Sequence, residues 1–435
     1  MRKLFLASVS VLALGISGAM AQQSTTIDDQ GSNNVNTVNQ NAAGTNSSVF
    51  IQQTGNGAGA SVTDNVVVDQ FSAGGDGTVD VFQDGDANAA IVLQENGGVG
   101  NAALIDQSGN GNNAGIAQFG EGNTGEINQS GDNNDLALEV QFGENNTALV
   151  DQSGSDNIAA IGQAGSGNAA TIDQSGTNNN AAVLQLGDDN EGTISQSGND
   201  NDLALDIQAG NGNTANVDQS GDGNIGAIGQ LANDNDATVL QGGTNGLATV
   251  LQTADGNIAE IEQASGDGNI AEIDQSGTGN TAALFQAGDD NQGFIDQSGN
   301  DNALALEIQA GNNNVANVDQ SGDGNLAGII QLGEGNDGTI TQTGNDNEIA
   351  LEIQAGSGNI ADVLQEGNAN LAGILQGGDN NFADVDQFGD GGVVGVLQLG
   401  ADHTATVTQL DTIVAGDVVT VSQTGTNGTA TVTQQ

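Results

Sequence analysis

A glutamine returns at a nearly constant spacing of about 11 residues over most of this chain. From Gln107 to Gln434 there are 29 such intervals, of which 23 have the basic length, five are one residue longer and one is three residues longer. In most units a Gly follows the Gln by two residues and an Asn follows it by five. A short fixed period marks a repeat architecture, in which each unit packs only against its neighbours. The spacing therefore argues against one bulky globular core and predicts a stack of similar rungs.

One repeat unit has the pattern of a short strand followed by a tight arc. In the unit that ends at Gln118, the residues from Asn112 onward alternate, and every second one falls on the same strand face as Gln118. The Gly-x-x-Asn step from Gly109 to Asn112 supplies the arc, because Gly and Asn tolerate positive φ. The apolar spacing is 2 and no 3.6-residue period appears, so we expect an all-β chain without helices.

Stacking is needed because a lone strand cannot bury its inner face. In a stack, each inward Gln and Asn lies above its counterpart in the next rung, and each amide has donors and an acceptor with which to form a ladder. We predict a β-solenoid with ladders of this kind. The predicted ladder residues are Gln107, Gly109, Asn112, Gln118, Gln152, Asn157, Gln163, Asn168, Gln174, Gln219, Asn224, Gln320 and Asn325.

Two units make one rung of about 22 residues, a period typical of solenoid repeats. The observation behind this pairing is that the residue after the Gln alternates between Ser and a bulkier apolar residue or Ala, with Ser108 and Phe119 as the first pair. Residues on either side of an inward Gln point outward, and the residue before the Gln is Asp in several Ser units, as in Asp106/Ser108, and apolar in the other units, as in Ala117/Phe119. The alternation therefore predicts one acidic outer face and one more apolar face. An odd number of units, five, separates Gln219 from Gln275, and we expect the two faces to exchange sides there.

Five of the intervals contain one extra residue. In four of them an apolar triplet follows the Asn at strand spacing, and the extra residue falls just before the next Gln, which predicts a β-bulge there that restores the inward direction of the Gln. The four triplets and bulge sites are Leu136/Leu138/Val140 before Gln141, Leu203/Leu205/Ile207 before Gln208, Leu304/Leu306/Ile308 before Gln309, and Ile349/Leu351/Ile353 before Gln354. In the fifth interval, after Gln263, we expect the extra residue in the arc.

Residues 1–21 have the pattern of a secretory signal peptide. Arg2 and Lys3 precede an apolar run, and Ala19-Met20-Ala21 is a small-x-small cleavage site. The run is too short for a membrane span, so we expect the mature chain to begin at Gln22, to be secreted and not to insert into a membrane.

Charge and composition narrow the function classes. The chain has 56 Asp and Glu and only two Lys and Arg, and both basic residues lie in the signal segment. A chain without basic residues has nothing to neutralise a phosphate backbone, so nucleic-acid binding is excluded. The chain also has no Cys, Trp, Tyr or Pro, and only 10 Phe. No disulfide holds it together, and the lack of Pro suits strands that must form ladders.

The repeat resembles the curlin repeat of bacterial curli subunits. The pattern Gln-x-Gly-x-x-Asn-x-Ala-x-x-x-Gln runs here from Gln163 through Gly165 and Asn168 to Gln174, with Ser between paired units. We divide the chain into the signal peptide, an irregular segment with degenerate repeats at 22–82, and a curlin-like array at 83–435. The resemblance implies an exported subunit of extracellular amyloid fibres, used for adhesion and biofilm. It also implies an outer-membrane secretion pore and a nucleator subunit as partners.

The ends of such a stack are expected to be sheet edges with unpaired N–H and C=O groups, about 15 rungs apart. Soluble proteins usually protect such edges with Lys, Pro or a covering helix, and we find none of these after Gln83. The uncharged last segment is therefore a candidate self-assembly edge, and an ordinary last rung is the alternative interpretation. Its candidate residues are Thr429, Thr431, Val432 and Gln434.

Four other functions remain open at this point. The runner-up is a monomeric cell-surface adhesin. Weak calcium binding would use the acids in alternate arcs, such as Asp188 and Asp189, but solvated turn residues are the plainer interpretation. Ice binding would need more outward Thr rows than the two present, and an enzyme would need catalytic residues that depart from the repeat. We interpret the single histidine, His403, as a structural substitute for the ladder Asn, and we expect no cofactor, metal or catalytic site.

Overall fold

The computed structural model describes residues 23–30, 34–40, 47–54, 65–71, 76–95, 99–134, 136–347, 349–410 and 417–434. Within these residues the chain forms 36 β-strands and no helix. The predicted signal peptide lies outside the described residues. No helix long and apolar enough to cross a membrane occurs in the part of the chain that is described.

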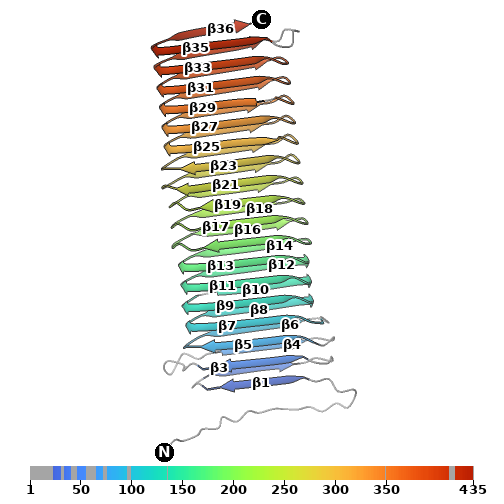
Figure 1. Cartoon of the computed structure of the whole chain (residues 1–435). Helices are drawn as coiled ribbons and strands as arrows, with labels where there is room; N and C mark the ends of the chain where they lie inside the picture. The colour runs from blue at the N-terminus through green and yellow to red at the C-terminus, as the bar shows by residue number, and fades with distance from the viewer. Residues whose placement is uncertain are drawn as a thin grey trace, which may run out of the picture.

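The strands form two parallel sheets that face each other, and the chain passes from one sheet to the other at every arc (Figure 1). Each strand pairs in parallel with the strand two places further along the chain, as β7 does with β9 and β8 with β10. Each sheet therefore contains 18 strands. The stack rises from β1 at the N-terminal end to β36 at the C-terminal end (Figure 1).

The odd-numbered strands form one sheet. Their bounds are β1 Ser24–Asp29, β3 Ser48–Gln53, β5 Thr78–Asp84, β7 Ala102–Asn110, β9 Thr124–Asp132, β11 Thr147–Ser155, β13 Ala169–Thr177, β15 Glu191–Gln196, β17 Thr214–Gln219, β19 Asp236–Gln241, β21 Ile258–Ser265, β23 Thr281–Ala287, β25 Leu304–Asn312, β27 Leu326–Glu334, β29 Ile349–Ser357, β31 Leu371–Asp379, β33 Val393–Ala401 and β35 Val418–Thr426.

The even-numbered strands form the other sheet. Their bounds are β2 Val35–Gln40, β4 Asn65–Phe71, β6 Ala89–Glu95, β8 Asn113–Glu121, β10 Leu136–Glu144, β12 Ile158–Ser166, β14 Asn180–Leu186, β16 Leu203–Ala209, β18 Ile225–Gln230, β20 Leu247–Gln252, β22 Ile270–Gln275, β24 Gln292–Gln297, β26 Val315–Gln320, β28 Asp337–Gln342, β30 Ile360–Glu366, β32 Phe382–Phe388, β34 Thr404–Leu410 and β36 Thr429–Gln434.

The predicted all-β solenoid, with two strands in each rung, is confirmed. Equivalent glutamines pair directly, as Gln107 does with Gln129 and Gln118 with Gln141, which are 22 and 23 residues apart. Towards the N-terminus the same pairing spans longer arcs, and Gln53 and Gln83 lie 30 residues apart. The strands of residues 22–82 thus continue the two sheets of the regular array, with longer insertions between them.

The core is one continuous column between the sheets. In most strands an Ala and then an Ile or Val precede the Gln at alternating positions, and these three side chains point inward and are buried. In β13, for example, Ala170, Ile172 and Gln174 are each at most 2% exposed. Because both sheets present the same sequence of inward residues, every layer of the core repeats the one below it.

The predicted β-bulges before Gln141, Gln208, Gln309 and Gln354 are wrong. Strands β8 and β10 pair without any shift from Ala114↔Ala137 to Gln118↔Gln141, so the outward side chains of β10 are Leu136, Leu138 and Val140. The extra residue lies earlier, between the ladder Asn and the strand. Before β16 it is Asp202, and the pairing of β16 with β14 begins only at Ala181↔Ala204.

The extra residue of the fifth long interval does follow Gln263. Strand β21 has a register shift between Gln263 and Ser265, where it pairs with β23. This agrees with the expected position after the Gln, although strand β21 continues there as far as Ser265 before the arc begins.

Candidate functional site

The inward glutamines form two hydrogen-bonded ladders, one in each sheet. In the odd sheet the Nε2 of Gln152 donates to Oε1 of Gln174 over 2.9 Å, and Gln174 donates in the same way to Gln196 over 2.7 Å. The even sheet repeats this from Gln163 to Gln185 over 2.9 Å. The Nε2 donates towards the C-terminal neighbour at every step, so each ladder has a direction. The other predicted ladder glutamines, all in such bonds, are Gln107, Gln118, Gln219 and Gln320.

The second proton of many of these amides crosses the core. Gln118 Nε2 donates to the carbonyl oxygen of Ala102 in the opposite sheet over 2.8 Å, and Gln163 does the same to Thr147 over 2.9 Å. The glutamines therefore connect successive rungs and also connect the two sheets. Because these amides are at most 1% exposed, losing one would leave its partners without a hydrogen bond in a dry interior.

The arc asparagines form a second type of ladder. Asn168 donates through Nδ2 to the carbonyl of Gly187 over 2.7 Å, and its Oδ1 accepts the backbone N–H of Asn190 over 3.1 Å. Both bonds go to the next rung in the C-terminal direction. The remaining predicted asparagines bond the next rung in the same two ways, and they are Asn112, Asn157, Asn224 and Asn325.

Gly109 has the backbone conformation that makes Gly necessary two residues after the Gln. Its φ is +106°, and a Cβ on it would collide with the carbonyl oxygen of Gly131 in the next rung. A second positive φ falls four residues after the Gln, where Asp189 has φ of +56° and Asp290 +55°. The ladder Asn itself is not left-handed. Asp and Asn are among the residues that tolerate this conformation, so it accounts for these arc acids.

A third ladder, which the sequence analysis missed, runs along the arcs three residues after the Gln. Asp188 Oδ1 accepts the backbone N–H of Ser166 over 2.8 Å, and the N–H of Asp188 donates to Asn211 Oδ1 over 2.8 Å. Asp222 accepts from Asn199 over 2.7 Å in the same way. The signal was present in the sequence as the frequent Asp or Asn at this position.

The arc acids therefore have structural roles at the positions considered for calcium. No group of three or more His, Cys, Asp or Glu that could hold a metal ion is found among the described residues.

His403 occupies the ladder-Asn position and reproduces the bond that an Asn accepts from the next rung. Its Nδ1 accepts the backbone N–H of Gly428 over 3.1 Å, which is the role of an Asn Oδ1. That leaves Nε2 as the donor to the carbonyl oxygen of Leu399, 3.3 Å away. The side chain is 1% exposed and holds the last rungs together, as expected for a structural substitution.

Four carboxyl groups are buried in the core where the other strands carry Ile, Val or Leu. They are Glu139, Asp206, Glu307 and Glu352, each 0% exposed, and none of their oxygens has a hydrogen-bond partner of normal geometry. These acids are the direct consequence of the register that contradicts the predicted bulges. Had the leucines of these units pointed inward, the acids would have pointed outward.

Each buried acid faces a Gly in the opposite sheet. Gly338 and Gly293 replace the usual inward Ala, and a Cβ there would lie 2.7 Å from Glu352 Oε2 and 2.6 Å from Glu307 Oε2. Gly125 faces Glu139 and Gly192 faces Asp206 in the same arrangement. The Gly precedes its acid by the same sequence separation in all four pairs.

Burial raises the pKa of all four carboxyls well above their ordinary values. For Glu139 the negative charge of Glu126 adds to the rise, while the backbone amides of Val150 and Glu126 lower its pKa only in part. For Glu352, burial is again the main cause, followed by the charges of Asp362, Asp337 and Glu307. A carboxyl in this environment favours the protonated form.

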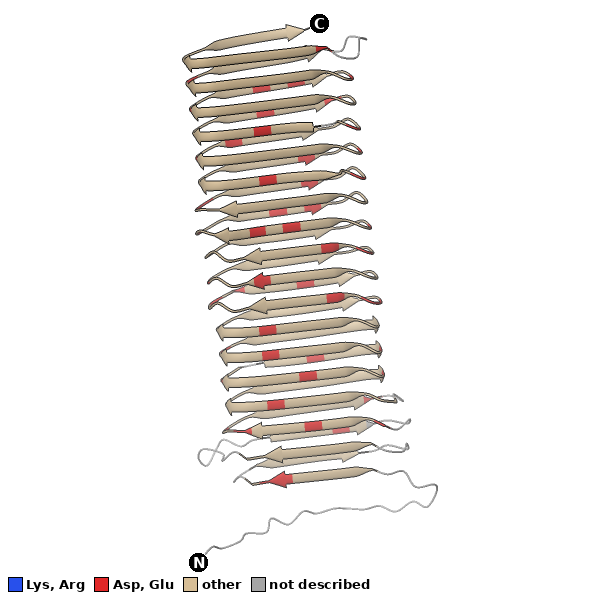
Figure 2. Ribbon diagram, in the orientation of Figure 1, with Lys and Arg blue, Asp and Glu red and all other residues tan. Residues whose placement is uncertain are grey.

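Acids on the outer surface of the strands are concentrated on one sheet at a time. At outward positions up to the residue after the Gln, acids lie on the odd sheet from β7 to β21 and on the even sheet from β22 to β32. Figure 2 colours the acids along the ribbon, inward and outward alike. Asp151 on β11 is an example of the first group and Asp274 on β22 of the second, and burial followed by neighbouring acids raises the pKa of both. The predicted exchange of the two faces between Gln219 and Gln275 is thus observed.

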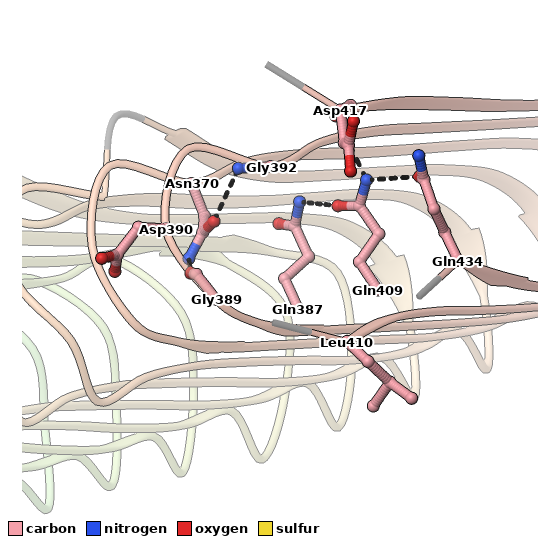
Figure 3. A pocket seen from close by; sticks show the side chains of 9 residues that line it. All are labelled: Asn370, Gln387, Gly389, Asp390, Gly392, Gln409, Leu410, Asp417 and Gln434. Atoms are coloured by element: carbon pink, nitrogen blue, oxygen red, sulfur yellow. Dashed lines mark hydrogen bonds between the residues drawn. The ribbon is translucent and has the colours of Figure 1, made fainter. Parts of the chain in front are cut away.

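The last strand, β36, pairs with β34 alone among the described strands, and its outer edge is open. Thr429 and Thr431 point outward from it, and Val432 and Gln434 point inward and are only partly buried. Gln409 donates through Nε2 to Gln434 Oε1 over 3.0 Å, so Gln434 is the last step of its ladder (Figure 3).

A small polar pocket lies beside this end of the ladder, between Asn370, Gln387, Gln409 and Gln434 (Figure 3). It forms where Gly392 stands at the ladder-Asn position and contributes no side chain. Asn370 Oδ1 accepts the N–H of Gly392 over 2.9 Å, so the backbone part of the ladder continues past the gap.

Comparison with known proteins supports the repeat assignment. The sequence model of the curlin-associated repeat matches nine overlapping segments that together cover more than half of the chain, namely residues 143–176, 165–198, 176–206, 210–243, 243–277, 311–344, 322–352, 356–389 and 378–410. A search among curated proteins found no match. With these repeats and the stacked β-fold, the chain belongs to the curlin-repeat family and is a curli-like structural protein of the amyloid type.

Proposed function

We propose that this chain is the structural subunit of an extracellular, curli-like amyloid fibre, which grows by end-to-end addition of copies and serves adhesion and the biofilm matrix. The observation that carries the proposal is that, among the described strands, β1 pairs only with β3 and β36 only with β34, so each end of the described stack has an unpaired strand edge. The proposal assigns the chain a structural role without catalysis.

The C-terminal end presents a backbone edge and a side-chain donor. The N–H of Thr404 donates to the carbonyl of Gly428 on its C-terminal side, and β36 repeats the register of β34. By the same alternation, the N–H and C=O groups of Thr429, Thr431 and Thr433 point to the open edge. The amide of Gln434 accepts from Gln409 through Oε1 and so directs its Nε2 away from the stack.

The N-terminal end presents acceptors at the matching positions. In the even sheet Gln40 donates through Nε2 to Gln70 over 2.9 Å, which leaves its Oε1 on the outer side, where Thr25 Oγ1 donates to it. In the odd sheet Asp29 lies opposite Gln53, at the place of a ladder Gln. Side-chain donors at one end and side-chain acceptors at the other favour head-to-tail stacking, which produces an open fibre.

Export completes the proposal. The predicted signal peptide at residues 1–21 would bring the chain out of the cytoplasm, and family resemblance supplies an outer-membrane pore and a nucleator as the proposed partners.

Electron microscopy of the purified chain from Gln22 onward tests the proposal, with Thr431→Pro as the decisive variant. Proline removes an N–H that faces the open edge and is not needed inside the stack. We expect long unbranched fibres from the unmodified protein. The Thr431→Pro protein should have the same circular dichroism but elongate at least tenfold more slowly.

Thr431→Val is the matched control, because it changes the same side chain and keeps the N–H, and it should elongate normally. Thr433→Pro gives a second test at the same edge should Thr431→Pro fail to fold. Discrete rods from the unmodified protein would contradict the proposal and favour a monomeric surface adhesin.

A further inference from the structure

The outer surface of the stack contains two faces without charge. We define the even apolar face as the outward residues of the seven strands β8, β10, β12, β14, β16, β18 and β20, taken three and one before the Gln and one after it. The odd apolar face is the same set of positions on the seven odd-numbered strands from β23 to β35. None of these positions on either face holds an Asp or a Glu.

Large side chains on these faces are exposed to solvent. On the even apolar face Phe142 is 49% exposed and Leu186 is 43% exposed, and the ring of Phe142 stacks on that of Phe119 with centroids 4.6 Å apart. On the odd apolar face Leu332 is 44% exposed and Leu399 is 41% exposed. A contiguous apolar surface of this size on a soluble chain marks an interaction site.

The odd apolar face also contains a shallow groove. Leu351, Leu375 and Leu397 line it, and Gly373 and Gly395 form its floor. A Cβ on either Gly would meet no atom within 4 Å, so the space above them is open. The even apolar face has rows of exposed side chains, such as Leu184 and Leu251. Successive strands have the same spacing on both faces. Rows of leucines on one parallel sheet can insert between rows on another, as in the dry interfaces between amyloid sheets.

We propose that the even apolar face of one stack pairs with the odd apolar face of a second copy, which holds two fibres side by side. This inference rests on the proposed fibre. The two faces lie on opposite sheets and in opposite halves of the chain. A neighbouring stack that runs in the same direction and is displaced by about half a molecule therefore brings them together.

Charge and area both favour a second copy of this chain as the partner that covers each apolar face. The rest of the surface is acidic, and the mature chain has no Lys or Arg to attract it, so the uncharged faces are where two copies approach without repulsion. Each face spans about 34 Å by 20 Å, from seven strand spacings and three outward positions. A pair would bury roughly 1,400 Å², which is within the range of about 1,200–2,000 Å² of specific interfaces.

The acidic halves make the pairing depend on salt. When apolar halves of two fibres meet, the acidic halves of the same fibres lie opposite each other. Asp274 and Asp319 on one stack would then face Asp106 and Asp151 on the other. Raising the ionic strength shortens the Debye length to ~3 Å at 1 M and weakens this repulsion. We therefore expect side-by-side pairs to be enriched at high salt.

Mass per length of individual fibres, measured by scanning transmission electron microscopy, tests the pairing because it counts the stacks in a fibre. Because each stack carries both faces, association does not stop at two stacks, and we expect the unmodified protein at about 0.5 M NaCl to give at least twice the value of a single stack. The double variant Leu375→Asp/Leu397→Asp should give the single-stack value, with unchanged elongation kinetics.

The matched control is Leu364→Asn, which replaces an outward leucine on β30, in the acidic half of the even sheet, without adding charge there, and it should leave the fibres paired. The neutral variant Leu375→Asn/Leu397→Asn separates loss of apolar contact from added charge, and it should also reduce pairing. Fibres of the Asp double variant that keep a mass per length of two or more stacks would overturn the inference. If the unmodified protein forms rods rather than fibres, the proposed function fails. The pairing can then still be measured as a rod dimer in sedimentation velocity, lost in the same variant.

Discussion

Glu352 lies directly across the core from Gly338, and a Cβ on that glycine would be 2.7 Å from the carboxyl oxygen Oε2. The relationship connects β28 in one sheet to β29 in the other and recurs at three further levels of the stack. The core therefore accommodates a carboxyl where it has Ile or Val elsewhere by removing a methyl group from the facing strand. The pair is a unit, and neither residue is explained without the other.

Substituting the pair tests this coupling. Gly338→Ala alone should destabilise the fold by about 1–3 kcal/mol, because the added methyl group crowds the buried carboxyl. The double variant Gly338→Ala/Glu352→Ile restores the ordinary core layer and should be at least as stable as the unmodified protein. Urea unfolding of the freshly purified chain measures both. Additive effects of the two substitutions would show that the residues do not interact.

The buried acids predict a stability that falls as the pH rises. Burial raises the pKa of Glu139 and its three counterparts, so the folded chain holds these protons more tightly than the unfolded chain does. The resulting stability is fully present below the ordinary carboxyl pKa, near 4, and is lost as the pH rises through the raised folded pKa.

Removing the ionisable groups checks the sign of this dependence. The variant Glu139→Gln/Asp206→Asn/Glu307→Gln/Glu352→Gln should unfold at higher urea concentration than the unmodified protein at pH 7, and its stability should depend less on pH. The control Glu144→Gln lies at the exposed end of the same strand as Glu139 and should change neither property. A quadruple variant with the original pH profile would mean that these carboxyls are not buried.

The glutamine ladder predicts a large cost for losing one amide in the middle of the stack. Gln219 accepts from Gln196 over 2.7 Å, donates to Gln241 over 2.9 Å and also donates to the carbonyl of Leu203 over 3.2 Å. Gln219→Leu keeps the volume and removes all three bonds, so we expect a loss of about 2–4 kcal/mol. Gln292→Leu replaces an exposed glutamine on the outer surface and should be neutral within about 0.5 kcal/mol. Equal effects of the two variants in urea unfolding would contradict the ladder.

Fibre growth should accelerate when the acidic faces are neutralised or screened. Asp151 stacks near Asp173 and Glu126, and burial followed by these two charges raises its pKa. Strand spacing of ~4.8 Å is well below the ~8 Å Debye length at physiological salt, so the repulsion acts along the stack. Thioflavin fluorescence should rise faster at low pH, at high salt and with calcium. A growth rate that does not change with pH, salt or calcium would show that repulsion between the acids does not oppose fibre growth.

Much of the fold could be predicted from the sequence because the repeat is strict. The period fixed the inward position of residues such as Gln107 and Asn112, and the alternation after the Gln predicted both the two-strand rung and the exchange of faces. Each of these features repeats many times, so local irregularities do not obscure it.

The buried acids could not be predicted from strand alternation alone. In the unit that ends at Gln208, alternation counted from the Asn places Leu203 and Leu205 inward, which also suits their apolar character. The structure instead keeps Ala204 inward, takes up the extra Asp202 before the strand, and buries Asp206. Gly192, in the preceding strand β15, was the available signal, but its meaning depends on a contact between the two sheets. The arc ladder at Asp188 was missed for a related reason, since a turn acid has no visible partner within its own unit.

The central claim is that the rungs stack along the fibre axis and continue from one molecule to the next. X-ray diffraction from aligned fibres of the purified chain tests it most directly. We expect a sharp meridional reflection at about 4.7–4.8 Å, parallel to the fibre axis. A reflection of that spacing on the equator, or none at all, would contradict the account.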